Sequence, residues 1–263
     1  MLLAVGVANA QDCSNSISAC GCTISSAGIY NVDSDLNATQ GLTSYGSCID
    51  VAADNVKLFT NAHNITGAGS GVGIHLRSKA RNVFLSSAGP RETYTTISGW
   101  KYGLESEADK VTAEGFLFNG NTTGVLLNGA ENNHIGCFES FNNSVYGVWI
   151  LNGSGNQIDY AAMWNNRVAG IYIGCSSTGP SGQACTEEHG ASSGNFIFED
   201  YSYSPGVSTQ SYGIAVEQGS TQNSIVDNWF DGNTVDGYFD GNTEGANLWH
   251  SNRYVTANQS FIQ

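Results

Sequence analysis

Residues 124–166 read GVLLNGAENNHIGCFESFNNSVYGVWILNGSGNQIDYAAMWNN, and this stretch states one pattern twice. The Gly-Val-Leu-Leu of residues 124–127 returns as Gly-Val-Trp-Ile at residues 147–150, 23 residues later. The Asn-His-Ile of residues 133–135 returns as Asn-Gln-Ile at residues 156–158 after the same interval. A fixed period of this length is the signature of proteins in which each repeat is one unit stacked on the next. The sequence therefore predicts a solenoid.

Two markers recur through most of the chain, and each is followed by residues that alternate between apolar and polar. Two such markers in each period indicate about three short strands per coil, since strand side chains alternate between two faces. Strands of successive coils would pair in parallel, about 4.8 Å apart. We therefore predict an all-β fold, a single-stranded parallel β-helix of about eight coils. The glycine marker lies at residues 73, 103, 124, 147, 170, 213 and 237, and the Asn-x-Ile marker or its equivalent starts at residues 133, 156, 195, 223 and 247.

Asparagine recurs at the positions expected for turns between strands. An Asn side chain at a turn can bond to the same residue one coil away, and Asn tolerates left-handed backbone. We interpret these residues as structural ladders and not as ligand sites. One predicted turn column comprises Asn121, Asn143, Asn166 and Asn233, and another starts with Asn228 and Asn252.

Composition limits the kind of partner. The chain has 263 residues, and 23 acidic residues face 9 Lys and Arg for a net charge of −14. A surface with this excess of negative charge repels nucleic acid and anionic membrane. It also disfavours tight binding of a strongly polyanionic substrate, unless the few cations are gathered in one place. Apart from the first ten residues, no apolar run in the sequence approaches the roughly 20 residues that span a bilayer. We therefore expect neither nucleic acid nor membrane among the partners.

The first ten residues read MLLAVGVANA, a short apolar run that ends in Ala-x-Ala before Gln11. This resembles the apolar part and cleavage site of a secretory signal peptide, and an ordinary apolar strand is the alternative. We expect residues 1–10 to be a signal-peptide remnant and the protein to be secreted or extracellular, including at a cell surface. We assign residues 11–50 to an N-terminal cap and first coil, and residues 51–263 to the β-helix, with an insertion at residues 174–193.

The chain has seven cysteines, and four of them lie near its start. Four cysteines suit two disulfides in an N-terminal cap, with three pairings that the sequence leaves open. Cys175 and Cys185 flank the insertion and would close a short loop, while Cys137 stands alone. A metal site is the alternative, but the Cys-Gly-Cys spacing at residues 20–22 is too short for the usual zinc knuckle. We predict disulfides and no metal, and no cofactor apart from the calcium ion considered below. The four early cysteines are Cys13, Cys20, Cys22 and Cys48.

Residues 23–32, 48–51, 53–58 and 61–67 form a series of short segments, the last of which reads Asn-Ala-His-Asn-Ile-Thr-Gly. The series resembles the opening coils of secreted right-handed parallel β-helix proteins, the pectin-lyase-like class associated with carbohydrate binding and sugar hydrolysis. In that class the last segment commonly has an Asp where this chain has Phe59-Thr60, and a Gly where it has Ala62. The resemblance implies the fold over nearly the whole chain. It implies no particular reaction, because the catalytic motifs of polygalacturonases, alginate epimerases and pectate lyases are not matched.

The register of residues 124–127 also determines which side chains point out of the coil. If Val125 and Leu127 point inward, Leu126 points outward, because neighbours on a strand alternate. Two members of the outward column, Trp149 and Tyr172, are aromatic and lie on adjacent coils. Flat rings at this spacing suit stacking on sugar rings; the alternative is that residues 174–193 cover them. The column comprises His75, Glu105, Leu126, Trp149, Tyr172, Ala215 and Phe239.

Two further outward positions are candidates for a site. Trp164 lies on a different strand with Phe141 and Tyr203 as its column neighbours, and we count it among the substrate-binding candidates. Glu199 and Asp227 fall in one column, on coils that become neighbours when the insertions are skipped. Like charges at that spacing raise one pKa, which suits a general acid, and they also suit a bound calcium ion.

A charged group gives the leading candidates for catalysis. His75 and Arg77 belong to one coil, and Glu105 and Glu107 belong to the next. Polyuronate lyases need a cation and a base, and glycosidases need two carboxylates about 5–10 Å apart. These four side chains suit either reaction. The alternative is a solvated lattice of salt bridges that contributes little.

Together these patterns favour an extracellular protein that binds or acts on a polysaccharide, with a neutral or weakly charged glycan across Trp149 and Tyr172. They do not distinguish lyase, hydrolase and epimerase chemistry. The alternative is a non-catalytic cell-surface, adhesive or fibre-forming protein. This alternative rests partly on residues 254–263, which look too short to cap the last coil, because an uncapped coil favours end-to-end self-association.

Overall fold

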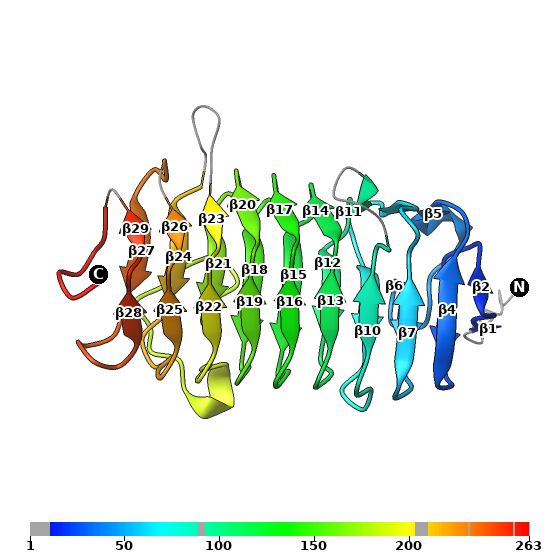
Figure 1. Cartoon of the computed structure of the whole chain (residues 1–263), viewed down its shortest axis with the longest axis horizontal. Helices are drawn as coiled ribbons and strands as arrows, with labels where there is room; N and C mark the ends of the chain where they lie inside the picture. The colour runs from blue at the N-terminus through cyan, green and yellow to red at the C-terminus, as the bar shows by residue number, and fades with distance from the viewer. Residues whose placement is uncertain (1–10, 89–92, 203–209, 231, 255, 263) are drawn as a thin grey trace, which may run out of the picture.

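The computed structural model describes residues 11–88, 93–202, 210–230, 232–254 and 256–262, so the segment expected to be a signal-peptide remnant, residues 1–10, lies outside it. Figure 1 shows one elongated stack of coils with the N-terminus at one end and the C-terminus at the other. The predicted all-β parallel solenoid is confirmed, with about nine turns in place of about eight. The extra turn arises because residues 11–37 already contribute strands to all three sheets.

A typical coil contributes one strand to each of three parallel sheets, called A, B and C. Among the described residues, sheets A and B have ten strands each and sheet C has nine. Sheet A consists of β1 (Gln11–Asp12), β3 (Cys22–Ile24), β6 (Ser47–Val51), β9 (Val72–Leu76), β12 (Tyr102–Ser106), β15 (Thr123–Asn128), β18 (Tyr146–Leu151), β21 (Ala169–Ile173), β24 (Tyr212–Val216) and β27 (Asp236–Asp240).

The other two sheets follow in the order of the chain, so that each coil runs from sheet A to B to C. Sheet B consists of β2 (Ser16–Ile17), β4 (Gly28–Val32), β7 (Val56–Phe59), β10 (Phe84–Ser86), β13 (Thr112–Glu114), β16 (His134–Gly136), β19 (Gln157–Asp159), β22 (Phe196–Phe198), β25 (Ser224–Val226) and β28 (Leu248–His250). Sheet C consists of β5 (Leu36–Asn37), β8 (Ile65–Thr66), β11 (Thr95–Ser98), β14 (Phe116–Asn119), β17 (Glu139–Phe141), β20 (Ala162–Trp164), β23 (Tyr201–Ser202), β26 (Trp229–Phe230) and β29 (Arg253–Tyr254).

The recurring glycine of sheet A is explained by close approach of neighbouring coils. A Cβ added to Gly124 would lie 2.7 Å from the carbonyl oxygen of Gly147, and one added to Gly147 would lie 2.5 Å from that of Gly170. Both distances are shorter than real Cβ contacts, so another side chain here would push the coils apart. The glycine that marks each repeat is therefore required by the close packing of neighbouring backbones.

The core is a set of apolar columns inside the stack. Val125 pairs with Val148 and Leu127 with Ile150, and all four side chains are fully buried. Burying a side chain of this size stabilises the fold by about 1.5–3 kcal/mol. Because each column repeats every coil, the inward face expected from the alternation of residues 124–127 is the actual core.

Asparagine ladders close the turns, as predicted. The backbone N–H of Asn133 donates to Oδ1 of Asn156 over 3.1 Å, and that of Asn156 donates to Oδ1 of Asn195 over 3.0 Å. Each rung therefore satisfies a buried backbone donor that no strand partner reaches. The ladder continues through Asn223 and Asn247, and a second ladder runs through Asn121, Asn143, Asn166, Gln210 and Asn233.

Three disulfides connect six of the seven cysteines, all of which lie in the described part of the chain. Near the N-terminus the pairs are Cys13–Cys22 and Cys20–Cys48, which is one of the three pairings left open by the sequence. The third disulfide, Cys175–Cys185, forms as predicted.

Residues 256–262 cover the last strand of sheet A, so the expectation of an uncapped end is wrong for this sheet. Ala257 forms a β-bridge with Tyr238, and the side chain of Asn258 accepts a hydrogen bond from the backbone N–H of Asp240 over 2.8 Å. Ile262 is fully buried against the core. The backbone groups that would favour end-to-end pairing are thus partly satisfied within the chain.

The predicted insertion at residues 174–193 leaves sheet A after β21 and rejoins the coil before β22. It contains the short 3₁₀ helix η3 (Glu187–His189); the other described 3₁₀ helix is η1 (Ala38–Gln40). The backbone N–H of Cys185 donates to the carbonyl oxygen of Gln218 over 2.7 Å, which fixes the insertion to the solenoid. In the described chain, no helix has the length and apolar character needed to cross a membrane.

Candidate functional site

The structure brings the four predicted catalytic residues together on the outer face of sheet A. Parallel pairing places His75 on β9 beside Glu105 on β12, while Arg77 and Glu107 follow directly after the ends of these strands. One coil earlier, Asp50 on β6 pairs with His75. We call Asp50, His75, Arg77, Glu105 and Glu107 the charged cluster.

Asp50 is the centre of the charged cluster, and it was missed at the level of sequence. Its side chain is fully buried and accepts hydrogen bonds from Arg77 Nε over 2.8 Å, from Arg77 Nη2, and from His75 Nδ1 over 3.0 Å. Burial alone would raise the pKa of Asp50, but these bonds and the positive charge of Arg77 lower it below its ordinary value. Extending the outward column one coil before His75 would have identified this residue.

His75 is held in one orientation. Because Asp50 is ionised and can only accept, the Nδ1–H of His75 is the donor, which directs Nε2 toward the next coil. There Nε2 lies 4.0 Å from Oε2 of Glu107. Tyr45 covers the other side, with its ring centroid 5.4 Å from that of His75 and 4.2 Å from Cζ of Arg77. The imidazole is therefore nearly buried, at 5% exposure, with one nitrogen committed to Asp50.

Glu105 has the electrostatics of a proton donor. Partial burial is the main cause that raises its pKa above the ordinary value, and the negative charge of Glu107 adds to this effect. The charges of His75 and Lys101 and a hydrogen bond from Asn128 act in the opposite direction without cancelling it. The charged cluster thus combines a carboxyl whose pKa is raised with a second carboxylate and an oriented imidazole.

The exposure expected of Trp149 and Tyr172 is wrong, because the insertion covers both. Trp149 is 7% exposed and donates from Nε1 to the carbonyl oxygen of Gly174 over 2.7 Å. Tyr172 is fully buried, stacks on Tyr146 at 4.6 Å between ring centroids, and donates its hydroxyl to Glu217. The two side chains do point out of the coil, but they form a second hydrophobic cluster beneath residues 174–193, as the alternative interpretation held.

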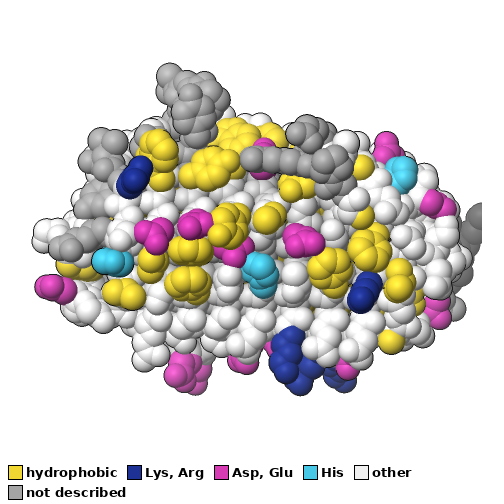
Figure 2. All heavy atoms as spheres, viewed as in Figure 1, with side chains coloured by type: hydrophobic (Ala, Val, Ile, Leu, Met, Phe, Trp, Pro, Cys, Tyr) yellow, Lys and Arg dark blue, Asp and Glu magenta, His cyan; other side chains and the backbone are white. Residues whose placement is uncertain are grey.

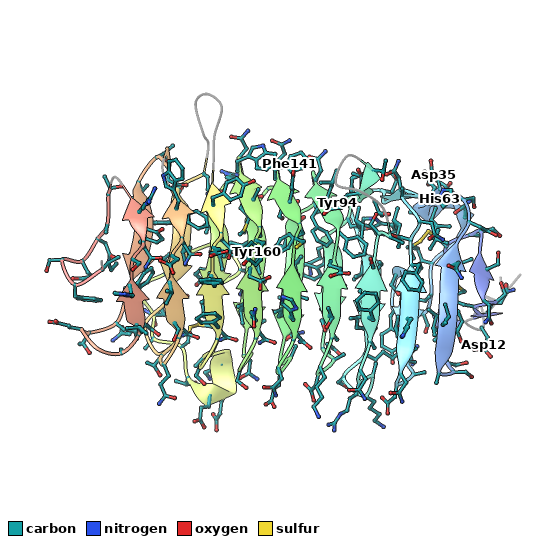
Figure 3. The ribbon with its side chains drawn as sticks, in the orientation of Figure 1. Asp12, Asp35, His63, Tyr94, Phe141 and Tyr160 are labelled. Carbon is teal, nitrogen blue, oxygen red and sulfur yellow. A yellow bond between two sulfur atoms is a disulfide. The ribbon has the colours of Figure 1, made fainter. Side chains whose placement is uncertain are left out.

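Trp164 is partly exposed on the face of sheets B and C. Its ring stacks on that of Phe141, one coil earlier, with centroids 4.4 Å apart and planes 6° apart. The predicted neighbour Tyr203 lies outside the described residues. Figure 3 shows Phe141 on the same face as Tyr94 and Tyr160, while sheets B and C face the viewer in Figure 1.

A cavity of about 260 Å³ opens at the turn between sheets B and C, and the sequence analysis did not predict it. Glu199 is one of its lining residues, and both Glu199 and Asp227 occupy this turn with left-handed backbone, so their predicted common column is confirmed. The signal in the sequence was a constant spacing, because each turn residue lies four positions after a marker asparagine. The lining residues are Tyr94, Cys137, Phe138, Tyr160, Glu199 and Tyr201, here called the tyrosine cavity.

The fold and its surface define a parallel β-solenoid whose outer faces carry clustered carboxylates and aromatic rings. No protein-family model matches the sequence, and no curated protein matches it. The solved structure of the Dettilon tailspike protein is similar, with a TM-score of 0.55 and 15% identity over 90% of this chain and 60% of that chain.

The alginate lyase from Paenibacillus sp. str. FPU-7 is also similar, with a TM-score of 0.52 and 12% identity over 91% of this chain and 88% of the lyase. At such identities the likeness concerns the fold, and it agrees with the β-helix resemblance of residues 23–67. The chain spans 60% of the length of the tailspike protein.

Proposed function

We propose that this protein is an extracellular polysaccharide hydrolase that cleaves an uncharged glycan at the charged cluster of sheet A. The observation that carries the proposal is the pair of carboxyls on one coil, where burial raises the pKa of Glu105 and Glu107 lies near the oriented His75. Two structural neighbours bear the names of a tailspike and an alginate lyase, which agrees with a carbohydrate partner. Three disulfides agree with an oxidising, extracellular location.

Hydrolysis is favoured over uronate elimination by the state of Arg77. A lyase needs a cation that neutralises the uronate carboxylate, but Arg77 already makes two hydrogen bonds to buried Asp50. The net charge of −14 also disfavours a polyanionic substrate. An uncharged glycan needs no such cation.

The proposed reaction assigns separate roles to the two glutamates. Glu105 donates its proton to the glycosidic oxygen as the bond to the anomeric carbon breaks, and Glu107 removes a proton from the water that adds to this carbon. His75 Nε2 lies 4.0 Å from Oε2 of Glu107, close enough for a protonated imidazole to attract that carboxylate. The backbone rises by about 6.6 Å over two extended residues, and the carboxyl groups of inverting enzymes lie about 6.5–9.5 Å apart, so two glutamates at this sequence spacing can reach that separation.

The test is incubation with soluble uncharged glycans, including dextran, laminarin, galactomannan and xyloglucan, followed by a reducing-end assay and NMR of the first-formed anomer. We expect cleavage of at least one glycan with inversion, and a loss of about 10²-fold or more in Glu105→Gln and in Glu107→Gln. Ile29→Ala, at an exposed position on sheet B, is the control for both variants. Full activity in either glutamine variant, or products from none of these glycans, would show the proposal to be wrong.

A further inference from the structure

We propose that the turn between sheets B and C carries a second glycan-binding site, centred on the tyrosine cavity, which takes an uncharged polysaccharide chain. It is separate from the charged cluster, because a coil runs from sheet A to B to C and this turn lies on the side away from sheet A. The site would therefore bind glycan whether or not sheet A cleaves it.

The first observation is an aromatic surface that extends beyond the cavity. Tyr160 is 54% exposed, Tyr201 is 38% exposed, and Trp229, which pairs with Tyr201 one coil later, is 52% exposed. The stacked pair of Phe141 and Trp164 continues this surface on sheet C. Figure 2 shows hydrophobic side chains gathered along the face of sheets B and C, with acidic side chains among them. Exposed aromatic rows of this extent usually have a partner.

The second observation is the backbone of the turn. Cys137, Tyr160 and Glu199 have φ angles of 52°, 50° and 53°, in the left-handed region that costs free energy for these residue types. In the other two turns most left-handed positions hold Asn or Gly, such as Asn132 and Asn142. Side chains retained at strained positions around a cavity indicate a role that Asn or Gly does not fulfil.

The third observation is charge, which selects the class of ligand. Glu199 accepts a hydrogen bond from the Tyr160 hydroxyl and raises the pKa of that phenol. Asp227 is exposed one coil beyond Glu199. Carboxylate oxygens accept hydrogen bonds from sugar hydroxyls and have several acceptor positions each, whereas a polyanionic glycan would be repelled. Rings for stacking together with carboxylates therefore fit an uncharged glycan.

Cys137 provides the assay, because its exposed thiol lies in the wall of the tyrosine cavity while the other six cysteines form disulfides. The rate of alkylation by iodoacetamide is measured by mass spectrometry with dextran, laminarin, galactomannan, xyloglucan or alginate. We expect at least one uncharged glycan to slow alkylation about tenfold at ten times its dissociation constant. Alginate should leave the rate unchanged. The Glu105→Gln variant should give the same protection, which separates this result from cleavage on sheet A.

Tyr160→Asn distinguishes binding from folding. Asn is favoured at a left-handed position, so we expect this variant to melt roughly 2–4 °C above the wild type while protection of Cys137 is lost. Ile29→Ala, which replaces a side chain of similar exposure on sheet B, should retain protection. Protection by alginate alone, by no glycan, or equally in Tyr160→Asn would overturn the proposal. Protection that rises with protein concentration without glycan would identify a second copy as the occupant and would also overturn it.

Discussion

The next two members of the turn column that contains Asp200 are asparagines, Asn228 and Asn252, and Asp200→Asn should stabilise the protein. The carboxyl is buried, Oδ1 accepts the backbone N–H of Ala161 over 2.7 Å, and Oδ2 has no hydrogen-bond partner among the described residues. One coil later the amide of Asn228 donates to the carbonyl oxygen of Ile197 over 3.0 Å and to Oδ1 of Asn252 over 3.1 Å. An asparagine at position 200 supplies an amide donor without having to bind a proton.

The size of the effect follows from the cost of a buried group without a partner. Burial raises the pKa of Asp200 well above its ordinary value of 3.8, and the nearby charge of Asp159 acts in the same direction. The folded state therefore retains this proton to higher pH than the unfolded state does, so the contribution of Asp200 to stability is greatest below about pH 4 and is lost as pH rises. We expect Asp200→Asn to raise the free energy of unfolding by about 1–3 kcal/mol at pH 7.

Urea denaturation followed by tryptophan fluorescence at pH 4 and pH 7 measures this difference. The advantage of Asp200→Asn should shrink toward pH 4, because both states of the wild type then approach full protonation. Asp227→Asn, exposed at the adjacent turn position, is the matched control and should change stability by less than about 0.5 kcal/mol. A variant that is less stable than the wild type at pH 7, or an advantage independent of pH, would refute the reasoning.

Three further perturbations test the packing. Replacing Cys175 and Cys185 with Ser should lower the free energy of unfolding by about 2–4 kcal/mol. It should also shift tryptophan emission to the red, because the insertion loosens over the buried aromatic side chains. Cys137→Ser, which removes no disulfide, is the control. Gly147→Ala should lower the free energy of unfolding by about 1–3 kcal/mol or more, measured in urea, whereas Gly28→Ala, with ordinary contacts, should change it little. Asp50→Ala should lower the free energy of unfolding by about 3–5 kcal/mol at pH 7. The lowered pKa of Asp50 stabilises the fold at pH values above the pKa of this group in the unfolded chain, so the difference between variant and wild type should decrease as pH falls. An unchanged difference at pH 3 would contradict this.

The predictable part of the site was the part that depends on strand register. His75 and Glu105 could be placed side by side because a period of coils and a two-residue alternation fix which side chains share a column. The same rule would have found Asp50, had the column been extended by one coil. Arg77 could be assigned to the cluster but not to a partner, since only the structure shows that Asp50 binds its guanidinium.

The repeat pattern could not predict the burial of Trp149. Register gives the direction of a side chain relative to its own strand, but residues 174–193 break the period, so nothing in the pattern specifies which face they cover. The tyrosine cavity was missed for a related reason, because Tyr94 lies far from Tyr160 in sequence and only the stacking of coils brings both to one wall.

The sequence by itself determined the parallel solenoid, its inward columns, its asparagine ladders and its glycine positions, because local contacts between one coil and the next repeat with a fixed period. The tertiary structure alone decided the disulfide pairing at the N-terminus, the covering of the last coil by residues 256–262, and which outward faces remain open. These features depend on segments that do not repeat. The contacts of such segments are set by the shape and chemistry of the surface on which they fold, so no periodic pattern in the sequence predicts them.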